Sequence, residues 1–240
     1  MIIKAHRKAL ARSVFQEFGG VIQRGPFAGV KFDGQANISQ AAHGLKIFGL
    51  YEEPVVERLL GQAGVDTFID VGAGDGYYPV SLLAKGGFRS AFAFEATDAG
   101  RAAIARNARL NGVTDRLQIF GRAGDDFVAQ LAALKIDWRA TLLLIDIEGA
   151  EFGLLSDELL SLTRGARYVV ELHDTYQSDP AARAKLLARL APHWKTEIVV
   201  DRARDWHGIG QIQEWHDLDR AVLVSEGRKL IGEWLVADPK

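Results

Sequence analysis

The sequence contains no cysteine and only one methionine. Without cysteine, disulfide bonds and thiolate metal sites are excluded, so any bound metal would need Asp, Glu or His ligands. The sequence also lacks an excess of charge of one sign, because its net charge is −2 at pH 7. We therefore expect neither nucleic acid nor a membrane surface among its partners.

Long hydrophobic runs are absent as well. No apolar run reaches the length of a membrane span, and the first residues, Met1 to Lys8, are not followed by the apolar core of a signal peptide. We therefore expect a cytoplasmic protein. Its composition, 48% hydrophobic and 25% charged over 240 residues, is typical of a soluble α/β domain with a sizeable core. The sequence leaves open whether the protein forms a homo-oligomer.

The chain divides at about residue 50. Residues 1–18 carry apolar residues at helical spacing among basic ones, which predicts an amphipathic helix packed on the core. The segment 19–49 is rich in glycine and has no clear period. We expect residues 1–50 to form an N-terminal helix and a lid-like extension. Residues 51–240 are expected to form one domain that begins with a helix over 53–61.

From residue 66 onward, apolar strand-like runs alternate with amphipathic helical patterns. This alternation predicts an α/β fold with a doubly wound, mostly parallel sheet of seven strands and helices on both faces. The last two runs have no full helix between them, so we expect a hairpin that places an antiparallel strand at one edge. The expected strands are 67–71, 90–94, 117–121, 141–146, 167–172, 195–202 and 220–226, and the expected helices are 77–86, 98–110, 125–134, 151–163 and 179–191.

The densest motif follows the first of these strands. Three glycines alternate over residues 72–76, and a strand, a glycine turn and a helix N-terminus together are typical of a nucleotide-type site. A dinucleotide-binding fold would have a third glycine where this chain has Tyr77, and the Lys-Ser/Thr pair of a P-loop does not follow. The carboxylates of Asp70 and Asp75 suit a cationic ligand, and S-adenosylmethionine carries a sulfonium and an ammonium group.

A further carboxylate follows the second predicted strand. Glu95 lies nineteen residues beyond Gly76, about where an acid that binds a ribose is expected. Such a carboxylate can accept hydrogen bonds from both ribose hydroxyls. The alternative is that Glu95 only caps the next helix.

Acids and one histidine gather after the fourth and fifth predicted strands, at the edge where open parallel sheets bind ligands. Asp146 and Glu148 follow the fourth strand, and alternation along the chain puts them on the same side. Glu151 stands at the start of the next helix, where it could cap the helix or orient a neighbour. His173 follows Glu171 at the end of the fifth strand, and its ordinary pKa suits a general base near neutral pH.

These motifs occur in the order seen in FkbM-type methyltransferases, and the sequence resembles that family over about residues 48–175. The string Asp146-Ile147-Glu148-Gly149-Ala150-Glu151 is the most specific part. The others are Gly49-Leu50-Tyr51-Glu52, Ile69–Gly76, Phe94-Glu95-Ala96, Asn107–Gly112 and Glu171-Leu172-His173. The family commonly has Asn at the position of Asp75 and Lys at the position of Leu144.

The resemblance implies a class I, S-adenosylmethionine-dependent fold and O-methyltransferase activity on sugars or natural products. It implies that the cofactor is held by the glycine turn and the acids around it, namely Glu52, Asp70, Gly72, Ala73, Gly74, Asp75, Gly76, Tyr77, Glu95, Ala96 and Asp146.

We therefore predict methyl transfer to a hydroxyl of a small-molecule or saccharide acceptor, with Asp146, Glu148 and His173 as candidate catalytic residues. One of the three would remove the acceptor's proton. They could instead hold a divalent cation that lowers the pKa of the acceptor hydroxyl. Oxygen-rich clusters also bind acceptors directly, so no metal ligand is assigned. The alternative functions are an NAD-dependent oxidoreductase and a non-catalytic S-adenosylmethionine-binding protein.

Overall fold

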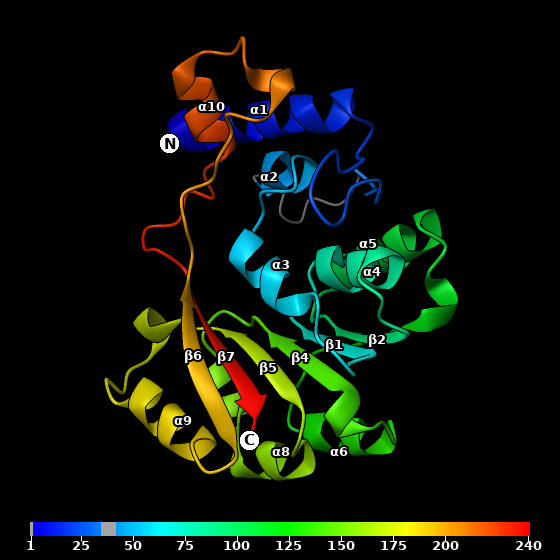
Figure 1. The fold of residues 1–240 in the computed structure, drawn as a ribbon, viewed down its shortest axis with the longest axis vertical. Coiled ribbons are helices and arrows are strands. Elements are labelled where there is room, and N and C mark those ends of the chain that lie inside the picture. Colours follow the sequence, from blue (N-terminus) through cyan, green and yellow to red (C-terminus); the bar gives the residue numbers. More distant parts are fainter. Residues whose placement is uncertain (1, 35–41) are drawn as a thin grey trace.

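A computed structural model describes residues 2–34 and 42–240 of the chain. Its centre is a seven-stranded sheet with the strand order β3-β2-β1-β4-β5-β7-β6 (Figure 1). Five neighbouring strands are parallel, and β7 runs antiparallel to both β5 and β6. The strands are β1 (Thr67–Val71), β2 (Ser90–Phe94), β3 (Leu117–Phe120), β4 (Thr141–Ile145), β5 (Arg167–Glu171), β6 (Trp194–Val200) and β7 (Glu233–Pro239).

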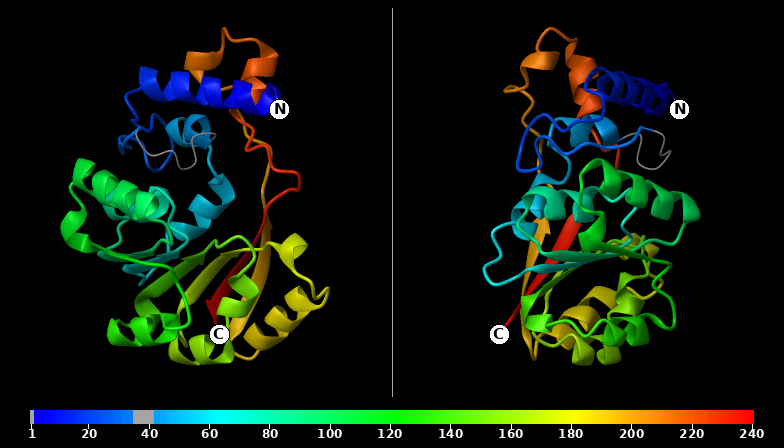
Figure 2. Two further views of the ribbon diagram at one scale, coloured as in Figure 1. Left: turned by 180° about the vertical axis from the view of Figure 1, so that it is seen from behind. Right: turned by 90° about the vertical axis from the view of Figure 1, so that its right-hand side faces the viewer.

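Helices cover both faces of the sheet. In Figure 1, α3, α4 and α5 lie above the sheet and α6, α8 and α9 lie below it, and the side view in Figure 2 shows the sheet between these layers. The upper helices are α3 (Glu53–Leu59), α4 (Tyr77–Lys85) and α5 (Asp98–Leu110), and the lower ones are α6 (Phe127–Ala133), α7 (Glu151–Leu154), α8 (Asp157–Leu162) and α9 (Ala182–Leu190). Short 3₁₀ turns span Thr114–Arg116, Trp138–Ala140, Asp174–Tyr176 and Gly210–Ile212.

Alternation along the strands explains these two layers. In β4, Leu142 and Leu144 belong to the apolar cluster shared with α3, α4 and α5, whereas Leu143 and Ile145 belong to the cluster shared with α6 to α9. Successive side chains of a strand point to opposite faces, so a fully apolar strand is buried on both. The predicted doubly wound, mostly parallel sheet is therefore confirmed.

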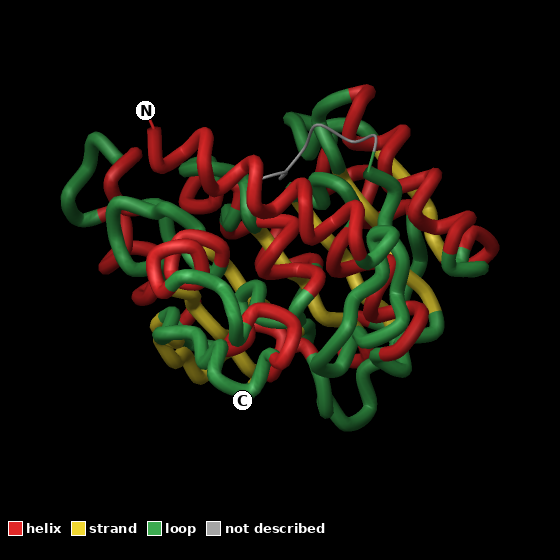
Figure 3. The backbone as a smooth tube through the Cα atoms, turned by 90° about the horizontal axis from the view of Figure 1, so that it is seen from above, coloured by secondary structure: helices red, strands yellow, loops and turns green. Residues whose placement is uncertain are grey.

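A third layer lies above α3, α4 and α5, farthest from the sheet. It consists of α1 (Ile2–Glu17), α2 (His43–Ile47) and α10 (Asp217–Leu223) (Figure 1), and the view from above shows helices crossing over the strands (Figure 3). Val14, Leu45 and Leu223, one from each helix, are buried in a common apolar cluster. Residues of the predicted N-terminal extension thus pack against a segment that lies near the other end of the sequence.

The end of the predicted sheet differs from expectation. Residues 220–226 were expected to form a strand, but most of them belong to α10, and the seventh strand is β7. A short apolar run such as 221–224 is compatible with either element, because it carries no periodicity that separates them. The antiparallel strand β7 also lies one place in from the edge, between β5 and β6.

The helix expected over 151–163 is two short helices. The break falls at Leu155 and Ser156, where the side chain of Ser156 accepts a hydrogen bond from the backbone amide of Leu159 and so starts α8 as its N-cap. In the ranges 2–34 and 42–240, no helix combines the length and the apolar content that a bilayer crossing would require.

Candidate functional site

The glycine turn between β1 and α4 packs directly against the end of β4. Gly72 has a φ of 97°, and a Cβ atom there would overlap the carbonyl oxygen of Asp146. The amides of Gly72 and Ala73 both donate to the carbonyl of Phe94, at 2.9 and 3.1 Å. Only glycine satisfies both the left-handed backbone and this close approach. The turn is therefore fixed beside the ends of β2 and β4.

Glu95 lies at the end of β2 and faces this turn. Its Oε2 accepts a hydrogen bond from the amide of Gly74 at 3.0 Å, and its Oε1 accepts from the amide and hydroxyl of Thr97 at 2.8 and 2.7 Å. Gly100 leaves the room for this side chain, because a Cβ there would come within 2.5 Å of the Glu95 Cγ. Ala96 is exposed, and Arg101 binds its carbonyl at 2.8 Å.

Asp70 is buried within β1, and its Oδ2 has no hydrogen-bond partner among the described residues. Burial raises the pKa of this carboxyl well above its usual value, and the nearby charges of Glu95 and Asp75 raise it further. A buried carboxyl oxygen that lacks a partner is costly, and a bound ligand is one group that could supply the missing contact.

Asp75 has a partner that the sequence did not predict. Lys46 of α2 donates to both oxygens of the Asp75 carboxylate, each at 2.9 Å, and both side chains are buried. The Lys46 ammonium also lies 5.2 Å from the ring centre of Tyr51 and 5.0 Å from that of Tyr77. The Tyr77 side chain itself is buried in the apolar cluster around α3 and α4, against Phe27.

A second ion cluster, whose carboxylates are buried, joins the N-cap of α3, the end of β5 and the loop before β7. Arg228 bridges the carboxylates of Glu52, Glu171 and Glu226. Glu52 also accepts a hydrogen bond from the Tyr78 hydroxyl. Burial raises the pKa of Glu52 to about 8, and the charge of Glu226 adds to the shift although Arg228 opposes it. The Glu52 carboxylate, a predicted cofactor contact, is thus already engaged by Arg228 and by the Tyr78 hydroxyl.

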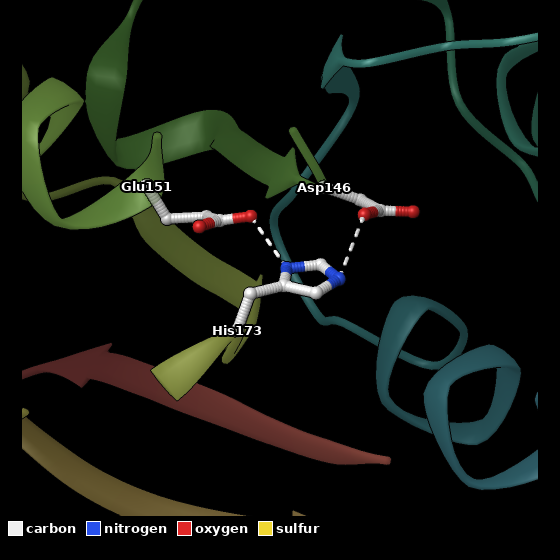
Figure 4. Close-up of side chains that lie close together, drawn as sticks. All are labelled: Asp146, Glu151 and His173. Carbon is white, nitrogen blue, oxygen red and sulfur yellow. Dashed lines mark hydrogen bonds and ion pairs between the residues drawn. The ribbon is translucent and has the colours of Figure 1, made fainter. Parts of the chain in front are cut away.

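Asp146, Glu151 and His173 form the third group (Figure 4). The Glu151 Oε1 lies 2.7 Å from the His173 Nδ1. The other ring nitrogen, Nε2, is 4.0 Å from the Asp146 Oδ1, 3.7 Å from the Glu148 Oε2 and 3.7 Å from the Glu171 Oε2. One histidine nitrogen is therefore tightly bound, while the other faces three carboxylates beyond hydrogen-bond distance.

The turn between β4 and α7 brings these acids together. β4 ends at Ile145, so strand alternation is not what places Asp146 and Glu148, contrary to our reasoning from the sequence. The backbone instead turns through positive φ values of 56° at Glu148 and 106° at Gly149. The Glu151 Oε1 accepts hydrogen bonds from the amides of Ile147 and Gly149, both at 3.1 Å, and closes the turn.

Protonation within this group follows from burial and hydrogen bonding. Burial opposes ionisation of Glu151, yet the hydrogen bonds from His173 and the Gly149 amide outweigh it and lower the pKa of Glu151. The hydrogen bond to Glu151 raises the pKa of His173 against the opposing effect of burial. Burial and the charge of Glu171 raise the pKa of Asp146 well above its usual value. His173 is therefore the group best placed to exchange a proton near neutral pH.

Asp146, Glu151 and His173 also offer three potential metal-ligand atoms within 4.8 Å of one another. Glu151 and the His173 Nδ1 are already bonded to each other, so a cation could use only Nε2 of the histidine. Glu148, a metal candidate in the sequence-based alternative, has a side chain that is 78% exposed. These contacts favour a proton-transfer pair over a metal cage.

Most of the predicted residues thus fall into two adjacent groups, the glycine turn with Glu95 and the cluster around His173. Glu52 lies instead in the Arg228 cluster, and the Tyr77 side chain lies in the apolar core. Sequence reasoning missed Lys46 and Arg228, and it left Glu151 as a mere cap or orienting group. No local pattern marks Lys46 or Arg228, because they meet their partners only through the third layer and the loop before β7. Leu144, where the resembled family has Lys, is buried in the core.

No family model and no curated protein match the sequence. Solved structures do match. The O-methyltransferase from Bacillus cereus in complex with SAH is 14% identical with a TM-score of 0.54, and the match covers 97% of this chain and 91% of that one. Cofactor-bound Rv0187 from MTB is 17% identical with a TM-score of 0.53, covering 99% and 89%. The M1A22 tRNA methyltransferase TrmK of B. subtilis is 12% identical with a TM-score of 0.45, covering 77% and 65%.

At these identities the likeness concerns the fold. The resemblance to FkbM-type enzymes and the expectation that no nucleic acid is bound stay predictions. The chain has the Rossmann-like fold of class I methyltransferases.

Proposed function

We propose that this protein is an S-adenosylmethionine-dependent methyltransferase, and more specifically an FkbM-type O-methyltransferase that acts on a hydroxyl of a small molecule or sugar. One observation carries the proposal. The glycine turn packs at Gly72 against the carbonyl of Asp146, whose side chain lies 4.0 Å from His173. The binding site for the methyl donor, at the glycine turn, and the proton acceptor, His173, would thus lie at the same edge of the sheet.

The residues at this edge fit the cofactor. Gly72 and Gly74 of the turn are partly exposed, so a ligand could approach their backbone, and Glu95 beside them would bind the ribose hydroxyls. Asp70 and Asp146 each hold a buried oxygen without a hydrogen-bond partner in the described part of the chain. Asp75 differs from the other acids, because Lys46 already neutralises it. We infer that Asp75 anchors the α2 segment over the cofactor and does not bind the cofactor's ammonium.

When bound, S-adenosylmethionine supplies an electrophilic methyl group on a positively charged sulfur. The protein's task is to align the acceptor and accept its proton. We assign Asp146 and Glu148 to orient the acceptor hydroxyl and His173 to take the proton on Nε2. In such a transfer the acceptor oxygen would gain the methyl carbon, the electron pair of the broken carbon–sulfur bond would stay on sulfur, and the hydroxyl proton would end on the His173 Nε2.

The class of acceptor is inferred from charge. The cluster around His173 consists of carboxylates, and Arg228, which pairs with Glu171 of this cluster, is shared among three glutamates. Such surroundings disfavour an anionic group near the reacting hydroxyl. A neutral polyol or a sugar fits better than a phosphate-bearing acceptor such as nucleic acid. The O-methyltransferase of B. cereus, crystallised with SAH on the same fold, supports transfer to oxygen but does not bear on the class of acceptor.

Calorimetry with S-adenosylmethionine, SAH and NAD tests the cofactor. We expect SAH to bind the wild type and Glu95→Gln to weaken that binding about 10- to 100-fold, since a hydrogen bond to a charged group contributes about 1.5–3 kcal/mol. Glu214→Gln is the matched control, because Glu214 is an exposed glutamate. Tight binding of NAD without binding of SAH would favour the oxidoreductase alternative and exclude the proposal.

Catalysis is tested by SAH release in the presence of a panel of monosaccharides. We expect His173→Gln to retain SAH binding and to lower turnover about 10²- to 10⁴-fold, the usual contribution of general base catalysis. A protein that binds SAH but methylates none of the hydroxyl acceptors would favour the non-catalytic binding alternative.

A further inference from the structure

We propose that Glu151 is a positioning residue that holds the His173 ring with its proton on Nδ1, so that Nε2 presents a free lone pair to the acceptor. The inference deepens the proposed function and rests on it only for the identity of the reaction. The orientation and protonation of the ring can be measured without an acceptor.

The contacts of Glu151 determine which His173 nitrogen carries the proton. The Glu151 Oε1 receives the amides of Ile147 and Gly149 at 3.1 Å and lies 2.7 Å from the His173 Nδ1. An ionised carboxylate only accepts hydrogen bonds, so Nδ1 must be the donor. The neutral ring is then the Nδ1–H tautomer, and Nε2 is left as the basic nitrogen.

The surroundings of Nε2 are consistent with this role. Within the described ranges, its nearest charged groups are the oxygens of Glu148 and Glu171 at 3.7 Å and of Asp146 at 4.0 Å, too far for hydrogen bonds. Glu171 is itself bound by Arg228, which reduces its charge toward His173. Nε2 therefore faces a negative environment without being blocked, so a protonated ring is stabilised by charge.

The ring cannot rotate away easily, because the neighbouring loop holds it. Tyr176 stacks on the His173 ring, with centres 5.7 Å apart and planes at 21°. Tyr176 in turn packs against Gly149, where a Cβ atom would come within 2.8 Å of it. Gln177 donates to the Gly149 carbonyl at 2.6 Å. Glu151, which is fully buried, and the stacked tyrosine thus fix the ring from two sides.

Fixing the tautomer has a chemical consequence. When Nε2 takes the proton of an acceptor hydroxyl, the ring becomes an imidazolium whose charge is balanced by the Glu151 carboxylate. The same interaction raises the pKa of His173. The base is therefore stronger, and the pH below which it is already protonated and inactive is higher.

Nitrogen NMR of ¹⁵N-histidine-labelled full-length protein tests the proposal. In the wild type we expect the neutral His173 ring as the Nδ1–H tautomer. In Glu151→Gln the amide oxygen can still accept from Nδ1, so the tautomer is kept and the titration midpoint moves to lower pH. In Glu151→Leu, which fills the buried space without an acceptor, we expect a mixture of tautomers.

The matched control is an exposed pair of the same kind. His207 Nδ1 and Asp205 Oδ1 are 2.9 Å apart with both side chains largely exposed. Asp205→Asn should leave the His173 signals unchanged. An Nε2–H tautomer in the wild type, or an unchanged His173 midpoint in Glu151→Gln, would overturn the proposal. Selective broadening of the Nε2 signal by stoichiometric Mn²⁺ would also overturn it, because Nε2 would then be a metal ligand.

Calorimetry with SAH separates this inference from the proposed function. Glu151→Gln should bind SAH within about twofold of the wild type, which also shows that the variant is folded. If the wild type fails to bind SAH while the tautomer and midpoint behave as described, the proposed function fails and the His173–Glu151 pairing stands. If SAH binds normally and the midpoint does not move, Glu151 has only a structural role.

Discussion

At the scale of single residues, the buried ion pair of Lys46 and Asp75 is a contact whose loss we expect to destabilise the protein strongly. Its two ions are almost fully removed from water and neutralise each other at 2.9 Å. A buried pair of this kind gains little over an apolar pair, but losing one partner leaves an uncompensated charge in a low-dielectric interior. The pair therefore adds little net stability, but both partners must be present for α2 to stay packed against the glycine turn.

We predict that Lys46→Met lowers the free energy of unfolding by about 3–5 kcal/mol, because it leaves the buried Asp75 carboxylate without its cation. Adding Asp75→Asn should recover most of this loss, since the neutral amide needs no counter-charge. Urea denaturation followed by tryptophan fluorescence measures both. Lys185→Met, which breaks the exposed pair with Asp179, is the control and should have little measurable effect. Equal losses in the two lysine variants would contradict the argument.

The residues of the site that lie in local motifs were predictable, and those that lie in long-range pairs were not. Glu95 and the glycine turn follow their strands directly, so their place at the sheet edge could be read from the sequence. Arg228 meets Glu52 across 176 positions of the chain. A surface-like Arg in a loop carries no local sign of such a partner.

At the scale of elements, the N-terminus of α5 holds the proposed ribose-binding acid. Thr97 caps the helix by accepting from the amide of Gly100 at 3.0 Å, and it also donates its hydroxyl to Glu95. The absence of a side chain at Gly100 lets Glu95 lie against the helix. The N-terminus of α5 and the Glu95 carboxylate are thus held together by the Thr97 side chain.

We predict that Gly100→Ala weakens SAH binding while leaving thermal stability nearly unchanged. Alanine favours the helix by up to about 1 kcal/mol over glycine, so thermal stability should change little. Its Cβ would come within 2.5 Å of the Glu95 Cγ and push the carboxylate out of place, so SAH binding should weaken at least tenfold. Gly153→Ala in α7, where a Cβ would meet nothing within 4 Å, is the control. Unchanged SAH binding in Gly100→Ala would remove Glu95 from the cofactor site.

Elements with a periodic sequence pattern were predicted well, whereas α10 and β7 were not. The amphipathic pattern of α5 gave its bounds, 98–110, as the structure has them. The run around Leu223 is apolar and short, and its helical form depends on packing against α1 and α2, which the sequence does not display. The strand β7 was missed for the same reason, because its pairing with β5 and β6 is a long-range contact that the local sequence does not display.

At the scale of the whole molecule, α1, α2 and α10 form a layer that is distinct from the sheet and holds Lys46 over the glycine turn. A Cβ at Gly44 of α2 would overlap the side chain of Leu223, so α2 and α10 touch without a gap. A layer with its own apolar cluster is expected to open as a cooperative unit.

We predict that Leu223→Ala costs about 2–5 kcal/mol and loosens the whole layer. Hydrogen exchange should accelerate together in α1, α2 and α10, while β1, β4 and β5 keep their protection. SAH binding should weaken as α2 becomes mobile. Leu218→Ala, at an exposed position of the same helix, is the control. Faster exchange confined to α10 would show that the three helices are not one unit.

The position of β7 has a consequence for how the protein is made. The sheet places this strand, near the end of the sequence, between two strands that were synthesised earlier. A nascent chain can assemble β1 to β5 on the ribosome, but β6 has no partner to pair with until residues 233–239 have emerged. Arg228, which pairs with Glu171 beside His173, emerges only a few residues earlier. Until then the Glu171 carboxylate beside His173 lacks its pairing with Arg228, so the charge at the proposed catalytic edge is complete only once β7 has joined the sheet.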